Sequence, residues 1–140
     1  MGQGCPKRTL CVSPQHRVLV ADPALTKALG LPEALVAAKG LLKLRGVRQR
    51  LGCRDVEYTH LVFDQHEIIF AEGCPTESFF PGPVAVNSVD FGIQQELREI
   101  FPRLSAASDA KKFENARTCV GVSKGQRLLQ RSKFSPKIPN

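Results

Sequence analysis

The sequence lacks any apolar run that approaches the roughly 20 residues of a membrane-spanning helix. Its first eight residues also lack the apolar core of a secretion signal. Taken as written, the chain therefore carries no sign of secretion or of a membrane span, and we expect no membrane partner. The sequence leaves the localisation open.

Cysteine is present, but without a pairing pattern. No two cysteines have the CxxC spacing, and their odd number leaves one over in any set of disulfide bonds. The three histidines likewise lack the paired spacing of metal ligands. The sequence thus indicates neither a disulfide framework nor a metal site, and we expect no cofactor. The cysteines are Cys5, Cys11, Cys53, Cys74 and Cys119.

Tryptophan is absent and tyrosine occurs once, whereas phenylalanine occurs eight times. The net charge is +7, and the whole excess lies in residues 103–140, which hold nine Lys or Arg against two Asp or Glu. Only Phe113 and Phe134 interleave with these charges. A basic end attracts nucleic acid nonspecifically, but we expect a solvated, partly disordered extension and no nucleic-acid partner.

The length of 140 residues suits about one domain with one core. Short runs of aliphatic and β-branched residues, bounded by Pro, Gly or Asp, predict strands. Period-two alternation along residues 56–63 predicts a strand that forms a hairpin with residues 67–71 across a turn at 64–66. Two earlier strands are predicted over residues 9–12 and 17–20.

Helical residues are predicted in two places. Residues 24–43 are rich in Ala and Leu and could hold a helix over 32–42, or a strand followed by one helical turn. A second helix is predicted from an N-cap at Asp90 to Ile100, ended by Pro102. The apolar residues on one face of that helix are Ile93, Leu97, Ile100 and Phe101.

Two stretches together resemble a known family. Residues 10–20 read LCVSPQHRVLV, and residues 58–79 read YTHLVFDQHEIIFAEGCPTESF. They closely resemble the bacterial Hint-type domains, which are related to Hedgehog and intein modules. In that group an S/T-P-x-H motif precedes a strand, and a segment of the form HLxFDxHEIIxAEGxxxES closes the fold. The stretch at residues 33–42 also resembles the strand and turn of that family.

The resemblance implies a mainly β fold, the horseshoe-like Hint architecture, incomplete and with a short C-terminal helix. Residues 8–103 would form the C-terminal part of a Hint-like domain. Residues 104–140 would form a basic, partly disordered extension.

The resemblance also implies a chemistry. In Hint domains a Cys or Ser at the first residue attacks the carbonyl of the preceding peptide bond, and a second nucleophile cleaves the resulting thioester or ester. The motif at residues 13–16 implies that His16 hydrogen-bonds the scissile amide and that Ser13 helps to hold that peptide. By its place at the start of the predicted hairpin, His60 resembles the later Asp, Cys or His helper position of the family. These three are the candidate catalytic residues.

The sequence departs from the family at its opening. No segment of the form C-F-x-x-G-T precedes the SPQH motif, and Cys5 lies in a context that resembles the loop leading into that motif. The terminal His-Asn of splicing inteins is also missing. We therefore expect no splicing and no cleavage by the chain as written. The expected partner is the missing N-terminal segment of the same domain, or a self-associated copy.

Several alternatives stay open from the sequence alone. His16 could be a strand-edge histidine satisfied by backbone groups. A structural role is favoured for His60 and for His66, which lies in the predicted turn at 64–66, where its imidazole could cap backbone groups. Cys74 could be an exposed, reactive thiol in a loop or a small buried residue. Glu77 and Ser78 most simply anchor a loop. In function, the alternative to an autoprocessing relative is a non-enzymatic β-domain that serves as a binding or structural module of a larger polypeptide.

Overall fold

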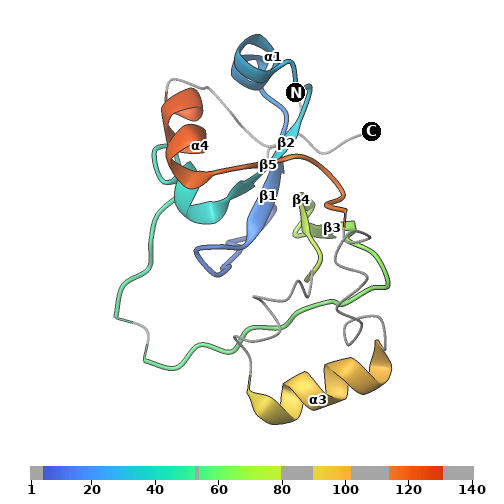
Figure 1. Ribbon diagram of the computed structural model, residues 1–140. Coiled ribbons are helices and arrows are strands. Elements are labelled where there is room, and N and C mark those ends of the chain that lie inside the picture. Colours follow the sequence, from blue (N-terminus) through green and yellow to red (C-terminus); the bar gives the residue numbers. More distant parts are fainter. Residues whose placement is uncertain (1–4, 53, 80–89, 102–113, 131–140) are drawn as a thin grey trace. The chain divides into compact units, whose positions relative to one another are not determined.

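The computed structural model describes residues 5–52, 54–79, 90–101 and 114–130 of the chain (Figure 1). The chain divides into two compact units. The first consists of residues 1–59, 68–77 and 117–140, and it contains the whole described sheet. The second consists of residues 60–67 and 78–116 and contains the helix α3, Phe91–Ile100.

The first unit is built on a five-stranded sheet of order β3-β4-β1-β2-β5 (Figure 1). All neighbouring strands are antiparallel except β2 and β5, which run parallel. The prediction of a mainly β fold with a short C-terminal helix is confirmed. The strands are β1 Arg17–Val20, β2 Ala34–Ala37, β3 Ile68–Ala71, β4 Cys74–Glu77 and β5 Cys119–Val120.

The two central strands carry the core. All four residues of β2 are buried, as expected for a strand covered on both faces. In β1 the buried residues Val18 and Val20 alternate with half-buried neighbours, so the predicted strand at 17–20 is confirmed. Leu25 lies in a helix before β2 in the sequence, and Leu129 lies in a helix near the C-terminus. Both side chains are almost fully buried and complete the core.

The helix α1, Pro23–Leu29, was not predicted. Its start is determined locally, because the Asp22 carboxylate accepts a hydrogen bond from the Ala24 N–H at 2.8 Å and Pro23 occupies the first helical position. Asp22-Pro23 signalled the end of a strand to us, but the same dipeptide also begins this helix.

After α1 the chain returns as β2 and then makes the 3₁₀ turn η1, Ala38–Leu41. Of the two interpretations of residues 24–43, the strand followed by a helical turn is therefore correct, and a helix over 32–42 is wrong. The physical reason is the sheet: Leu35 and Val36 pair with β1 on one side and with β5 on the other.

Residues 117–129, within the stretch predicted to be a basic extension, belong to the first unit. They form β5 and the helix α4, Val122–Leu129. α4 lies against η1 and β2, where the Gln126 side chain donates a hydrogen bond to the Lys39 carbonyl at 3.0 Å. The sequence had suggested no regular element here.

The predicted hairpin between residues 56–63 and 67–71 is wrong. β3 instead pairs with β4, with Ala71 opposite Cys74. The two central residues of the connecting turn, Glu72 and Gly73, both have positive φ, of 52° and 74°. This is the backbone of a type I′ turn, whose twist matches that of a two-stranded ribbon. Such a two-residue turn outcompetes the looser turn at 64–66.

The two faces of residues 56–63 also explain the error. In an extended strand, Leu61 and Phe63 would lie on the face opposite Val56 and Tyr58. Both faces of such a strand would be apolar, so the alternation does not determine which face is buried. All four side chains are exposed. Within this stretch the structure records one bridge, between Val62 and Phe79.

The strand predicted at residues 9–12 is also absent, although Leu10 packs against the core. α3 follows the N-cap Asp90 as predicted and ends at Ile100, while Pro102 lies outside the described residues. Its apolar face is largely exposed, with Ile93 at 47% and Ile100 at 60%. None of the described helices has the length and apolar character needed to cross a bilayer.

Close packing of α4 depends on two glycines around Val36. A Cβ added to Gly125 would lie 2.7 Å from Val36 Cγ1, and one added to Gly40 would lie 3.2 Å from the same atom. Val36 is fully buried and β-branched, so it has little freedom to move aside. The methyl group of Val36 therefore fills the space that these glycines leave.

We expect Gly125→Ala to lower the free energy of unfolding by about 1–3 kcal/mol through overpacking, although alanine is the better helix former by about 1 kcal/mol. Urea denaturation would measure this change in the free energy of unfolding.

Gly92→Ala in α3 is the control, because open space surrounds Gly92. In a double-mutant cycle with Val36→Ala the two effects should not be additive. Additivity, or an unchanged stability of Gly125→Ala, would contradict this packing.

Candidate functional site

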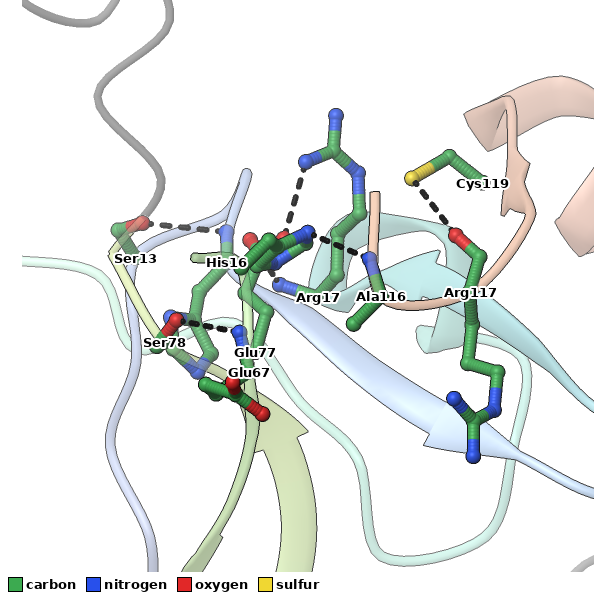
Figure 2. Close-up of polar contacts among 10 residues, drawn as sticks. Ser13, His16, Arg17, Glu67, Glu77, Ser78, Ala116, Arg117 and Cys119 are labelled. Carbon is green, nitrogen blue, oxygen red and sulfur yellow. Dashed lines mark hydrogen bonds and ion pairs between the residues drawn. The ribbon is translucent and has the colours of Figure 1, made fainter. Parts of the chain in front are cut away.

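The SPQH motif forms a tight turn immediately before β1 (Figure 2). The His16 N–H donates to the Ser13 carbonyl at 3.1 Å and to the Ser13 Oγ at 3.2 Å. A serine at the first position of a turn commonly holds it in this way. Two of the three candidate catalytic residues are therefore brought together, and the hydroxyl of Ser13 keeps its own O–H as a donor.

A second set of backbone bonds fixes this turn to the start of η1. The Ala38 N–H donates to the His16 carbonyl at 2.8 Å, and the Lys39 N–H donates to the Pro14 carbonyl at 3.0 Å. These bonds continue the β1–β2 ladder, in which Arg17 faces Ala37. The backbone of His16 is thus held by its N–H and by its carbonyl.

A buried carboxylate holds the next peptide. Glu77, at the end of β4, is 8% exposed. Its Oε1 accepts the Arg17 backbone N–H at 2.8 Å, and its Oε2 accepts the Arg17 guanidinium at 3.0 Å (Figure 2). Such charge-assisted, two-point binding is stronger than a neutral hydrogen bond. Glu77 thereby ties β4 to the residue that directly follows His16.

The surroundings of this ion pair affect two pKa values. Burial acts to lower the pKa of Arg17, but its hydrogen bond with Glu77 and the Glu77 charge outweigh burial, and the net pKa is raised. For the Cys119 thiol in β5, burial raises the pKa, with the Arg17 charge opposing and the Glu77 charge adding to the effect. Cys119 is therefore kept protonated and is not an activated nucleophile.

The segment before the turn is held to the β3–β4 hairpin by Glu72. The Lys7 N–H donates to the Glu72 carbonyl at 2.8 Å, and the Arg8 guanidinium binds both Glu72 oxygens, at 3.0 and 2.6 Å. The hydrogen bond and charge of Arg8 lower the pKa of Glu72. The approach to the SPQH turn is thus anchored to the same hairpin that supplies Glu77.

Residues of the second unit make contacts of their own. The His60 ring, the third candidate catalytic group, is exposed and lies 4.8 Å from the Phe79 ring, centroid to centroid. The buried His66 accepts the Ala116 N–H at Nδ1, at 3.2 Å. This matches the interpretation of His66 as a cap for backbone groups.

Ser78 and Glu67 form a reciprocal pair in the second unit. The Ser78 Oγ accepts the Glu67 N–H at 2.9 Å, and the Ser78 N–H donates to the Glu67 carbonyl at 2.8 Å. Ser78 is fully buried. The loop anchoring expected of Ser78 is therefore confirmed, whereas Glu77 holds a strand residue, Arg17 of β1.

Neither Cys5 nor Cys74 is placed as an open nucleophile. Both are buried, so the interpretation of Cys74 as a buried residue is correct and a loop position is wrong. Burial, and then a hydrogen bond with the Cys5 thiol, raises the pKa of Cys74 to about 12. Of the cysteines that the structure describes, Cys11 is exposed. Within the same part of the chain, no three His, Cys, Asp or Glu side chains gather as a metal site would need.

The family model of the Hint domain matches residues 1–83, which is more than half of the chain. The chain belongs to the Hint domain family. The matched region of this Hint domain includes the SPQH turn, Glu77 and four of the five described strands. The fifth strand, β5, lies beyond the match. No curated protein and no solved structure matches the chain.

Glu77, Arg17 and Glu72 are the residues of this Hint domain that sequence reasoning did not connect with His16. The available signal was the "ThrGluSer" stretch at the end of β4, in which the acidic Glu77 stands between two residues that the structure shows to be fully buried. Its partner lies 60 residues earlier in the chain, which no local pattern could reveal.

We expect Glu77→Gln to lower the free energy of unfolding by about 2 kcal/mol, because the half-buried Arg17 guanidinium would lose its charge partner. Urea denaturation at neutral pH would measure the loss. Glu67→Gln is the matched control, since that side chain is exposed and the Ser78 bonds use its backbone. Equal losses from the two variants would argue against a special role for Glu77.

The Arg8–Glu72 pair predicts a pH dependence. Because the folded-state pKa of Glu72 lies below its usual value near 4.5, the pair stabilises the fold fully above that pH. The contribution is lost as the pH falls from about 4.5 through the lowered pKa. The stability difference between the natural chain and Glu72→Gln should therefore be constant above pH 5 and shrink below about pH 4.5. A pH-independent difference would contradict this assignment.

Proposed function

We propose that this Hint domain chain supplies the donor side of an autoprocessing site, and that its 140 residues do not cleave by themselves. In the reaction a nucleophile bonds to the carbonyl carbon of the preceding residue, the carbon–nitrogen bond breaks, and the leaving nitrogen takes up a proton. The His16 imidazole would hydrogen-bond that amide and provide the proton. Membership of the Hint family supports the reaction class.

The observation that carries this proposal is the rigid backbone at His16. A donor is effective only when it is held in place before the reaction. The His16 N–H bonds to Ser13, its carbonyl bonds to Ala38, and the next peptide bonds to the buried Glu77. The Ser13 Oγ already accepts the His16 N–H within the turn. Ser13 would therefore orient the scissile peptide by donating its O–H.

The lack of activity by the chain alone is supported by three of the cysteines that the structure describes. Cys5 and Cys74 are buried, and the pKa values of Cys74 and Cys119 are raised, so their thiolate forms are disfavoured. We propose that the nucleophile belongs to an opening segment of the domain. His60 remains a proposed helper residue; its ring is exposed and lies beside that of Phe79.

The opening segment is also the partner that we propose. In the first unit, Leu51 is 80% exposed, and Val56 and Tyr58 are each about half exposed. Exposed apolar side chains of this kind are suited to being covered by an added segment. A second copy of the chain is the alternative occupant. A non-enzymatic β-domain that presents these side chains to another protein is the alternative function.

The test is a fusion that restores a C-F-x-x-G-T opening segment, with a reporter peptide before it, followed by intact mass after incubation with dithiothreitol or hydroxylamine. We expect cleavage, and we expect His16→Ala to slow it about 100-fold, the scale of a positioned proton donor. Ser13→Ala should slow it less. Gln15→Ala, an exposed position in the same turn, is the matched control and should have no effect.

Three outcomes decide between the functions. Cleavage of the 140-residue chain alone would contradict its proposed dependence on another segment. Equal rates for His16→Ala and the unchanged fusion would remove His16 from the reaction. A folded fusion that never cleaves would favour the binding or structural module. Circular dichroism of each fusion separates loss of activity from loss of folding.

A further inference from the structure

Two cysteines far apart in the sequence lie together in the core. Cys5 is 6% exposed and Cys74 is 3% exposed, and both belong to one cluster of buried apolar residues that includes Val18. The Cys5 thiol contributes to the raised pKa of Cys74, and the Lys7 N–H donates to the Glu72 carbonyl at 2.8 Å, which brings the chain around Cys5 beside the chain around Cys74. The sequence did not predict this pair, because the two residues share no spacing motif.

The backbone around each thiol is fixed by bonds close to it. Cys74 directly follows the Glu72–Gly73 turn and stands opposite Ala71 in the β3–β4 ladder. The Lys7 N–H and the Arg8 guanidinium bind Glu72, two residues before Cys74. Both sulfurs are therefore held near each other by contacts that do not involve sulfur.

A held pair of thiols differs chemically from a single one. Once one sulfur has formed a mixed disulfide, the second attacks within the same molecule, and this step has a high effective concentration. Burial raises the pKa of Cys74 to about 12 and keeps its thiol protonated, so the first exchange is slow. The pair is thus protected from random modification but favours ring closure once exchange has begun.

We propose that Cys5 and Cys74 form a dithiol–disulfide site that low-molecular-weight disulfides close. The thiolate of one cysteine attacks a sulfur of oxidised glutathione, forms a mixed disulfide and releases one glutathione thiolate. The other cysteine, after losing its proton to solvent, attacks the protein sulfur of that mixed disulfide and releases the second glutathione. The two protein thiols are oxidised, and one glutathione disulfide is reduced to two glutathione molecules.

The closed site would tie the segment before the SPQH turn to the β3–β4 hairpin. The loop between the two cysteines contains β1, α1 and β2, so the bond constrains much of the unfolded chain. This function is independent of autoprocessing. It requires neither His16 nor an opening segment.

The experiment uses the full 140-residue chain with Cys11, Cys53 and Cys119 changed to Ser. After incubation with oxidised glutathione at mildly alkaline pH, we expect a loss of about 2 Da and a tryptic peptide that links Cys5 to Cys74. The melting temperature should rise by roughly 5–15 °C and return with dithiothreitol. The matched control retains Cys11 and Cys119 and carries Cys5→Ser and Cys74→Ser, and it should form no internal link.

The natural chain provides a second measurement that needs no substitution. Its oxidised form should yield the Cys5–Cys74 peptide as the main cross-link, even if the triple variant folds poorly. Glutathione adducts without an internal bond would overturn the proposal, as would cross-links between two copies. A lower melting temperature after closure would also overturn it, because a held pair should close without distortion.

Discussion

The carboxylate of Glu77 connects the parts of this Hint domain on which the candidate site depends. It is buried at the end of β4, and it binds both the backbone N–H and the guanidinium of Arg17. A buried carboxylate is tolerated only with such partners, so β4 and the start of β1 must meet. Because Arg17 directly follows His16, the same contact also fixes the position of the His16 backbone, from which the candidate donor side chain extends.

The parts of the fold that were predicted correctly have local causes. Residues 17–20 and 68–71 are mostly apolar runs between turn residues, and both are strands. Asp90 occupies the N-cap position of α3, although its side chain makes no capping hydrogen bond. The helix α1 had an equally local signal in Asp22-Pro23, which we read only as the end of a strand.

The remaining parts depend on contacts that no local pattern encodes. β4 contains Pro75, which argues against a strand, yet a two-residue turn pairs it with β3. β5 is two residues long and exists because it runs beside β2. At the site, the SPQH motif pointed to Ser13 and His16, whereas Glu77 and Glu72 act across 60 and 64 residues.

The packing of Val36 between Gly40 and Gly125 shows that the domain extends beyond the region that the family model matches. The family match ends at residue 83, but the strand and helix that cover β2 come from residues 119–129. A protein shortened to the matched region would lack β5, so the peptide groups on one edge of β2 would have no strand partner. It would also expose Val36, which is fully buried in the whole chain, to water. An edge of that kind recruits strands from neighbouring molecules. The solubility of this domain therefore depends on a part of the chain that its family signature does not include.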